Sequence, residues 1–313
     1  MDGYIVKSPV LLLIFNRPDT TRQVFDQIRR ARPTRLYIAA DGPRTTKEGE
    51  AVLCEEARTI ALEVDWQCTV KTLYRDQNLG CKKAVHTAIN WFFEQEEEGI
   101  ILEDDCLPVS DFFYFCDSML EHYRQDTRVM NVTGTNLQFG KKWGNASYYF
   151  SRYSHIWGWA SWRRAWKAYD VNLEKYNEEE AHRYLSYLFD DMFLLKGWMD
   201  IFRRLKAGEI DSWDYQFNLI TFFENALCVT PNVNLISNLG FRPDATHTYN
   251  VHMFHASLPA GKLEKPIIHP DYFIPETEAD YFFLKKDFYL EPMWKRHNKK
   301  TKRFKRWLRG LLR

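Results

Sequence analysis

The chain has 313 residues, 45% of them hydrophobic and 16% aromatic, which excludes a disordered chain and allows a large core. Six scattered cysteines form no C-x-x-C pair, so neither a zinc motif nor a redox motif is expected. The formal net charge of +1 conceals an uneven distribution, because residues 295–313 hold ten of the 43 lysines and arginines and none of the 42 acids.

The beginning of the chain shows no sign of a leader peptide. It lacks a basic n-region, and the apolar run over residues 9–15 is too short to cross a membrane. We therefore expect an intracellular protein with free thiols.

Apolar runs alternate with amphipathic segments through the first 110 residues. Buried strands are expected at 9–15, 35–40, 69–74 and from 99 onward. Helices are expected after a cap at Asp19 or Thr20 and over 51–62 and 78–93. This alternation predicts an α/β fold in which helices flank a mostly parallel central sheet.

The second half is less regular. Strands are expected at 129–133, 148–150 and 228–231, and helices over 161–169, over 177–206 with a break near Gly197, and over 213–225. Residues 232–248 and 259–281 are expected to be loops. No repeat, linker or domain boundary is evident before the tail at 295–313.

Three consecutive acids, Glu103, Asp104 and Asp105, follow the fourth expected strand. Such a cluster indicates either a solvated acidic turn or a divalent metal that carries a phosphorylated ligand. Asn16 and Arg17 follow the first strand, and the carboxyl ends of parallel strands meet at one edge of a sheet. The convergence favours a ligand site.

Other candidates each have an ordinary structural explanation. Asp41 fits a contact to a base or ribose, but also a plain Asp-Gly turn. Arg75 and Asn78 precede a helix whose positive end suits an anion, yet Asn78 also fits a helix N-cap. The chain contains no P-loop, and no dinucleotide fingerprint follows its first strand.

Two later residues are candidates for catalysis and metal binding. Asp214 follows Trp213, and a carboxylate among aromatic rings suits a general base, although a helix N-cap is the commoner role. His247 fits a metal or phosphate ligand, but a surface histidine is the default, and three histidines lie nearby.

The tail has an amphipathic pattern. Phe304, Trp307, Leu308, Leu311 and Leu312 fall on one helical face, and basic residues cover the rest. This predicts an interfacial helix on an anionic membrane, and a peripheral location at its inner face. A docked C-terminal helix is the structural alternative. Nucleic-acid binding is disfavoured by the acidic body of the chain.

Residues 101–105, together with 111–115, resemble N-acetylglucosaminyltransferase I and its relatives. The resemblance continues in order through 9–17, 38–42, 132–136, 158–159, 213–214 and 232–242. Bacterial sugar-nucleotide transferases of polysaccharide assembly are similar through 157–166 and 244–248. The chain differs from the Golgi enzymes in lacking their N-terminal anchor and stem and in having the basic tail.

The resemblance implies a metal-dependent, inverting glycosyltransferase of the GT-A fold, with a nucleotide-binding half at 1–125 and an acceptor half at 126–294. It implies Mn²⁺ or Mg²⁺ as cofactor, a donor that is most simply a UDP-sugar, and a glycan or lipid-linked acceptor. The roles implied are metal binding by Asp105 and His247, proton removal by Asp214, donor binding by Asn16, Arg17, Asp41, Arg75, Asn78, Glu103, Asp104, Trp213 and Arg242, and acceptor binding by Trp157, Gly158 and Trp159.

Two other function classes remain open. A sugar-1-phosphate nucleotidyltransferase has a related sheet and also needs metal, but residues 11–18 lack the glycines of its triphosphate-gripping loop. A non-catalytic, membrane-recruited protein that binds a nucleotide sugar is the other.

Overall fold

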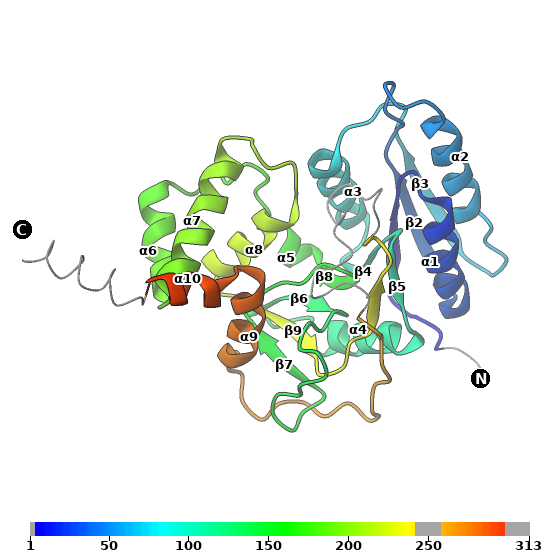
Figure 1. Cartoon of the computed structure of the whole chain (residues 1–313). Coiled ribbons are helices and arrows are strands. Elements are labelled where there is room, and N and C mark those ends of the chain that lie inside the picture. Colours follow the sequence, from blue (N-terminus) through cyan, green and yellow to red (C-terminus); the bar gives the residue numbers. More distant parts are fainter. Residues whose placement is uncertain (1–3, 242–257, 298–313) are drawn as a thin grey trace, which may run out of the picture.

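The computed structural model describes residues 4–241 and 258–297. An eight-stranded sheet in the order β3-β2-β1-β4-β8-β6-β9-β7 runs through the middle (Figure 1). Its strands are β1 Val10–Ile14, β2 Arg35–Ala40, β3 Thr69–Tyr74, β4 Glu98–Glu103, β6 Val129–Thr133, β7 Tyr148–Ser151, β8 Trp159–Trp162 and β9 Leu227–Pro231. A small second sheet pairs β5 Cys106–Pro108 with β10 Ile236–Asn238.

The sheet is parallel in its first half and mixed in its second. β3, β2, β1 and β4 pair in parallel, whereas β8 is antiparallel to both of its neighbours and β7 is antiparallel to β9. Six of the eight strands therefore run in one direction. The predicted α/β fold, a central sheet flanked by helices, is confirmed.

Helices cover both faces of the sheet, because alternate side chains of its buried strands point to opposite sides. The helices are α1 Pro18–Ala31, α2 Glu50–Ala61, α3 Cys81–Gln95, α4 Ser110–His122, α5 Arg163–Trp166, α6 Glu178–Leu188, α7 Met192–Lys206, α8 Asp214–Phe223, α9 Thr277–Asp287 and α10 Leu290–His297. Leu12 and Ile38 pack with α1, α2 and α4, whereas Leu11 and Tyr37 pack with α3, α5, α7 and α8.

Several predicted boundaries are wrong. α1 begins at Pro18, before the predicted cap at Asp19 or Thr20, because the fixed φ of proline suits the first helical position. The break in 177–206 falls at 189–191, where Asp191 caps α7 by accepting bonds from Phe193 N and Leu194 N. Gly197 lies inside α7, where the Phe288 ring leaves no room for a Cβ. The predicted loops contain β10 and the start of α9.

Asp280 ties α9 to β7. Its carboxylate accepts hydrogen bonds from Ser151 Oγ at 2.5 Å and from the Arg152 backbone N–H at 2.9 Å. Burial raises the pKa of Asp280 to about 6. The bonds fix the helix that brings Phe283 and Asp287 to the site described below.

The raised pKa of Asp280 predicts a pH-dependent stability. The folded protein holds this proton more tightly than the unfolded chain, where the pKa of an aspartate is about 3.9. As the pH rises from about 4 to 6, the contribution of Asp280 to the free energy of unfolding should fall by at most about 3 kcal/mol. Urea denaturation at both ends of this range should show a smaller fall in Asp280→Asn. Parallel profiles for the two proteins would contradict the assignment.

Within residues 4–241 and 258–297, no helix combines the length and apolarity needed to cross a bilayer. Arg242, His247 and the amphipathic pattern at 304–312 lie outside the described residues. The start of the predicted tail, residues 295–297, forms the end of α10.

Candidate functional site

The candidate residues converge on a cavity of about 620 Å³ at the carboxyl ends of β1, β2 and β4. This is the edge at which ligands bind in open α/β sheets. Both sequence halves contribute to the wall, so residues far apart in the chain share one space. The predicted site residues that line it are Asn16, Arg17, Asp41, Arg75, Asn78, Glu103, Asp104, Asp105, Trp157, Trp213 and Asp214.

The three acids share one nearby guanidinium. Arg17 follows β1, and its Nη1 lies 2.6 Å from Asp105 Oδ2 and 3.8 Å from Asp104 Oδ1. Asp104 also accepts a hydrogen bond of 3.0 Å from the Phe15 backbone N–H. β4 leads directly into a tight turn, which holds the three carboxylates together.

Proton affinities reflect this crowding. Burial, followed by the charge of Asp105, raises the pKa of Asp104 to about 7, although Arg17 opposes the shift. Burial and the charges of Asp105, Asp104 and Asp214 raise the pKa of Glu103 well above its ordinary value. Burial and mutual repulsion therefore disfavour the charged forms of these acids, and a bound cation would favour them.

The acids fit a metal ion that takes most of its ligands from phosphate and water oxygens and few from the protein. In the described part of the chain, no group of three His, Cys, Asp or Glu side chains is arranged to hold a metal ion. Mg²⁺ is commonly held by one or two carboxylates, with phosphate and water oxygens completing its shell. Asp105 could supply such a carboxylate, and its partner Arg17 could then face the diphosphate.

The late loop lies directly against Asp105. The Leu239 backbone N–H donates to the Asp105 carbonyl at 2.7 Å, and the Gly240 N–H donates to Asn238 Oδ1 at 2.7 Å. A Cβ on Gly240 would overlap the Asp105 carboxylate. The segment 232–242, one of those that carry the resemblance, therefore contacts Asp105 through its described residues.

Asp41 holds the neighbouring loop. Its oxygens accept hydrogen bonds from the backbone N–H groups of Gly42 and Leu79 and from Asn78 Nδ2, at 2.9–3.1 Å. These bonds use about all the acceptor capacity of a carboxylate. Burial raises the pKa of Asp41, and the backbone bonds oppose the shift. Asp41 therefore fixes the β3–α3 loop, whatever it contacts in a ligand.

Gly42 permits the close approach of the two loops. A Cβ at this position would lie 2.5 Å from backbone atoms of Gln77. Gly42→Ala should push the loops apart, weaken the contact between Asn78 and Asp41, and lower the free energy of unfolding by about 1–3 kcal/mol. Urea denaturation would measure the effect. An unchanged free energy of unfolding would contradict the prediction.

Asp214 also lines the cavity, at the first turn of α8. Ser212 Oγ donates a hydrogen bond to Asp214 Oδ1. The preceding Trp213 stacks on Trp159, with ring centroids 5.7 Å apart and an interplanar angle of 24°. The aromatic layer beneath the carboxylate therefore fixes its position.

The three predicted acceptor-side residues do not share one environment. Trp157 lines the cavity. Trp159 is fully buried in β8 and lies below the cavity wall, so its indole supports Trp213 and does not face a ligand. Gly158 has a φ of 61°, and a Cβ there would overlap Ile236. Glycine at this position therefore allows the backbone to pass close to the Ile236 side chain. Of the three residues, only Trp157 therefore lines the cavity.

The sequence analysis did not predict several of the residues that line this cavity. α9 brings Phe283 and Asp287 to the wall, although its sequence was expected to be partly loop. Burial and the charge of Asp214 raise the pKa of Asp287 to about 6. The spacing of apolar residues 279, 283 and 284 after Pro275 could have revealed this helix. The other missed lining residues with polar side chains include Arg44, Tyr153, Ser154, His155, Asp211, Ser212, Tyr215, Asn218 and Asn238.

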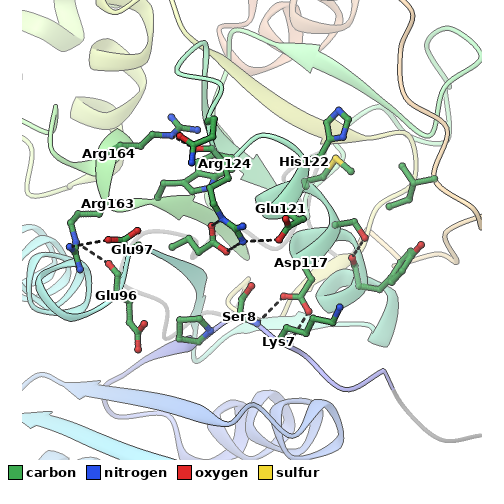
Figure 2. A pocket seen from close by; sticks show the side chains of 18 of the residues that line it. Lys7, Ser8, Glu96, Glu97, Asp117, Glu121, His122, Arg124, Arg163 and Arg164 are labelled. Carbon is green, nitrogen blue, oxygen red and sulfur yellow. Dashed lines mark hydrogen bonds and ion pairs between the residues drawn. The ribbon is translucent and has the colours of Figure 1, made fainter.

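A larger cavity of about 1350 Å³ lies at the opposite ends of the strands (Figure 2). Its charged groups are largely paired within the protein. Arg124 bonds to Glu98 and Glu121, and Asp117 accepts hydrogen bonds from the backbone N–H groups of Lys7 and Ser8. These contacts hold the N-terminal segment and α4 in place, which accounts for the polar lining without a ligand.

No protein-family model matches the chain, and no curated protein matches it in sequence. Solved structures that align with it include two of UDP-glucose pyrophosphorylase. One, complexed with UDP-glucose, has 11% identity and a TM-score of 0.27 over 48% of this chain and 64% of that chain. The other, an apo form, has 10% identity and a TM-score of 0.35 over 71% of this chain and 90% of that chain. Similarities this low carry no argument, so the function is inferred from the cavity.

Proposed function

We propose that the protein is a metal-dependent, inverting glycosyltransferase of the GT-A type that uses a nucleotide-diphosphate sugar, most simply a UDP-sugar. The observation that carries the proposal is the pairing of two different carboxylate sites in one cavity. One is the acid cluster beside Arg17, and the other is Asp214 at the start of α8. Transfer from a diphosphate needs both a stabilised leaving group and a base.

The donor half would bind the nucleotide along the ends of β1, β2 and β3. Asn16, Arg17, Arg75 and Asn78 offer amide and guanidinium donors there. Asp105 would hold Mn²⁺ or Mg²⁺, which as a Lewis acid offsets the charge of the departing diphosphate. Glu103 and Asp104 would accept hydrogen bonds from ribose and sugar hydroxyls. His247 and Arg242 remain predictions for metal and donor binding.

The acceptor half would supply the base. Asp214 would remove the proton from the acceptor hydroxyl as that oxygen attacks the anomeric carbon. The bond from the anomeric carbon to the diphosphate oxygen then breaks, and the configuration inverts. Ser212 would orient the carboxylate through its hydrogen bond. Trp157 would contact the acceptor sugar through its ring.

The negative charge of the acceptor half of the cavity favours an acceptor without an acidic group near the reacting hydroxyl. Asp211, Asp214 and Asp287 all line the acceptor half. Among the described lining residues, lysine and arginine occur only as Arg17, Arg44 and Arg75, on the donor side. A neutral or amino sugar at the end of a glycan or lipid-linked acceptor fits this distribution, as in surface polysaccharide assembly.

A donor screen tests the proposal. The protein is incubated with UDP- and GDP-sugars and Mn²⁺, and release of free nucleotide is measured with and without chelator. We expect metal-dependent release from one UDP-sugar. Formation of a UDP-sugar from UTP and a sugar 1-phosphate would instead indicate a nucleotidyltransferase. Metal-dependent UDP binding without either reaction would indicate a non-catalytic binding protein.

The tail would place the enzyme at its acceptor. Residues 295–313 carry ten basic residues and no acid, a composition suited to the anionic inner face of a membrane. A peripheral, cytoplasmic enzyme attached in this way would reach the head of a lipid-linked acceptor.

A further inference from the structure

Large exposed apolar side chains gather where α6, α7 and α10 meet. Among the described residues, 14 large hydrophobic side chains are exposed, and six of them belong to α6, the start of α7 and the segment around α10. Tyr187 is 73% exposed, Met192 59% and Trp294 43%. We call this set the aromatic face, and it consists of Tyr184, Tyr187, Met192, Tyr289, Met293 and Trp294.

The aromatic face is held in place by folded structure. α10 packs on α7, and α6 packs on α7 (Figure 1). Trp294 Nε1 donates to Asp191 Oδ2 at 3.1 Å, and Asp191 also caps the helix that begins at Met192. The rings of Tyr184 and Tyr187 lie 6.4 Å apart. The exposed rings are thus fixed by folded structure, although none of them is needed for the core.

Basic residues lie at the end of α10 and become more frequent beyond it. Lys295 and Arg296 are exposed there, and the exposed acids of α6, α7 and the segment around α10 include Glu178, Glu179, Asp190, Asp200 and Glu291. The sequence then continues through residues 298–313, with eight further basic residues and no acid. Exposed Trp and Tyr beside Lys and Arg are the residues that anchor proteins at a lipid–water interface.

We propose that the aromatic face is the folded part of a membrane-binding surface, which lies on anionic lipid together with the tail. This extends the membrane attachment proposed for residues 295–313. A polyanion such as heparin would engage the basic residues alone and would gain little from Tyr187 or Met192. The surface begins only a few residues after Asp287 in the cavity wall, so it would bring the acceptor half close to the lipid.

Vesicle co-sedimentation of the full chain tests the proposal. Vesicles of phosphatidylcholine, with or without phosphatidylglycerol, are compared for the unaltered protein and for the triple variant Tyr187→Ser, Met192→Ser, Trp294→Ser. We expect binding to anionic vesicles to weaken at least about tenfold in the variant. The control is Tyr272→Ser with Ile274→Ser, two side chains exposed elsewhere, and it should bind as the unaltered protein does. Circular dichroism and UDP binding confirm that each variant is folded.

A tail variant separates the two attachments. In it, Lys302, Arg303, Lys305 and Arg306 are changed to Gln in the full chain. Loss of binding in this variant, with normal binding in the triple variant, would overturn the aromatic face but leave the tail attachment standing. Absence of vesicle binding by the unaltered protein would overturn both. Binding to heparin as tight as to vesicles, unaffected by the triple variant, would identify a polyanion site instead.

Discussion

Replacing Asp214 by asparagine is expected to lower the rate of sugar transfer by about 10²–10⁴-fold, the usual contribution of a general base. Asparagine keeps the shape of the side chain and can still accept the hydrogen bond from Ser212. It cannot remove a proton. The donor half is untouched, so metal-dependent UDP binding should change by less than about threefold.

Two comparisons make the Asp214 result specific. Asp200→Asn, on the exposed side of α7, controls for the loss of one negative charge. Asp211→Asn removes a second acid from the same wall, where Asp211 accepts a hydrogen bond from the Lys82 backbone N–H. Normal transfer by Asp214→Asn would contradict the assignment. An equal loss in Asp211→Asn would show that the charge of the wall, and not one base, is required.

Asp105→Asn should abolish metal-dependent nucleotide binding in the donor half of the site. The change removes the proposed metal ligand and the carboxylate that bonds to Arg17 at 2.6 Å. We expect UDP affinity in the presence of Mn²⁺ to fall at least about 100-fold, since a neutral amide is a poor ligand for a hard cation. Titration calorimetry measures this loss directly. Thermal unfolding should confirm an intact fold.

Asp126→Asn is the matched control for Asp105→Asn. Asp126 is also paired with an arginine, Arg128, but it lies in the turn before β6, away from the cavity. It should leave UDP binding unchanged. Equal affinities for UDP in Asp105→Asn and the unaltered protein would contradict the role of Asp105.

The sheet and its site-bearing edge were predictable because their signals are local. A run such as Val10–Ile14 must be buried on both faces, and polar residues directly after it must lie at the strand end. The order in which strands assemble was not predictable. β8 pairs with both β4 and β6, and a pairing across some 60 residues leaves no periodic trace in either strand.

Site residues that directly follow a strand were predictable from the sequence. Site residues whose position depends on the packing of distant segments were not. Asp105 and Asp214 meet in one cavity, as expected. Trp159 was expected to face an acceptor, but it is an inward residue of β8 whose ring supports Trp213. Asp287 reaches the wall only because Asp280 ties α9 to β7, a contact between segments about 130 residues apart.

The central claim is that the acids at the end of β4 bind a nucleotide diphosphate through a divalent metal. Calorimetric titration of the unaltered protein with UDP, in Mn²⁺ and then in chelator, tests it most directly. We predict binding in Mn²⁺ that is lost in chelator. Absence of UDP binding in Mn²⁺, or the same affinity with and without the metal, would contradict the claim.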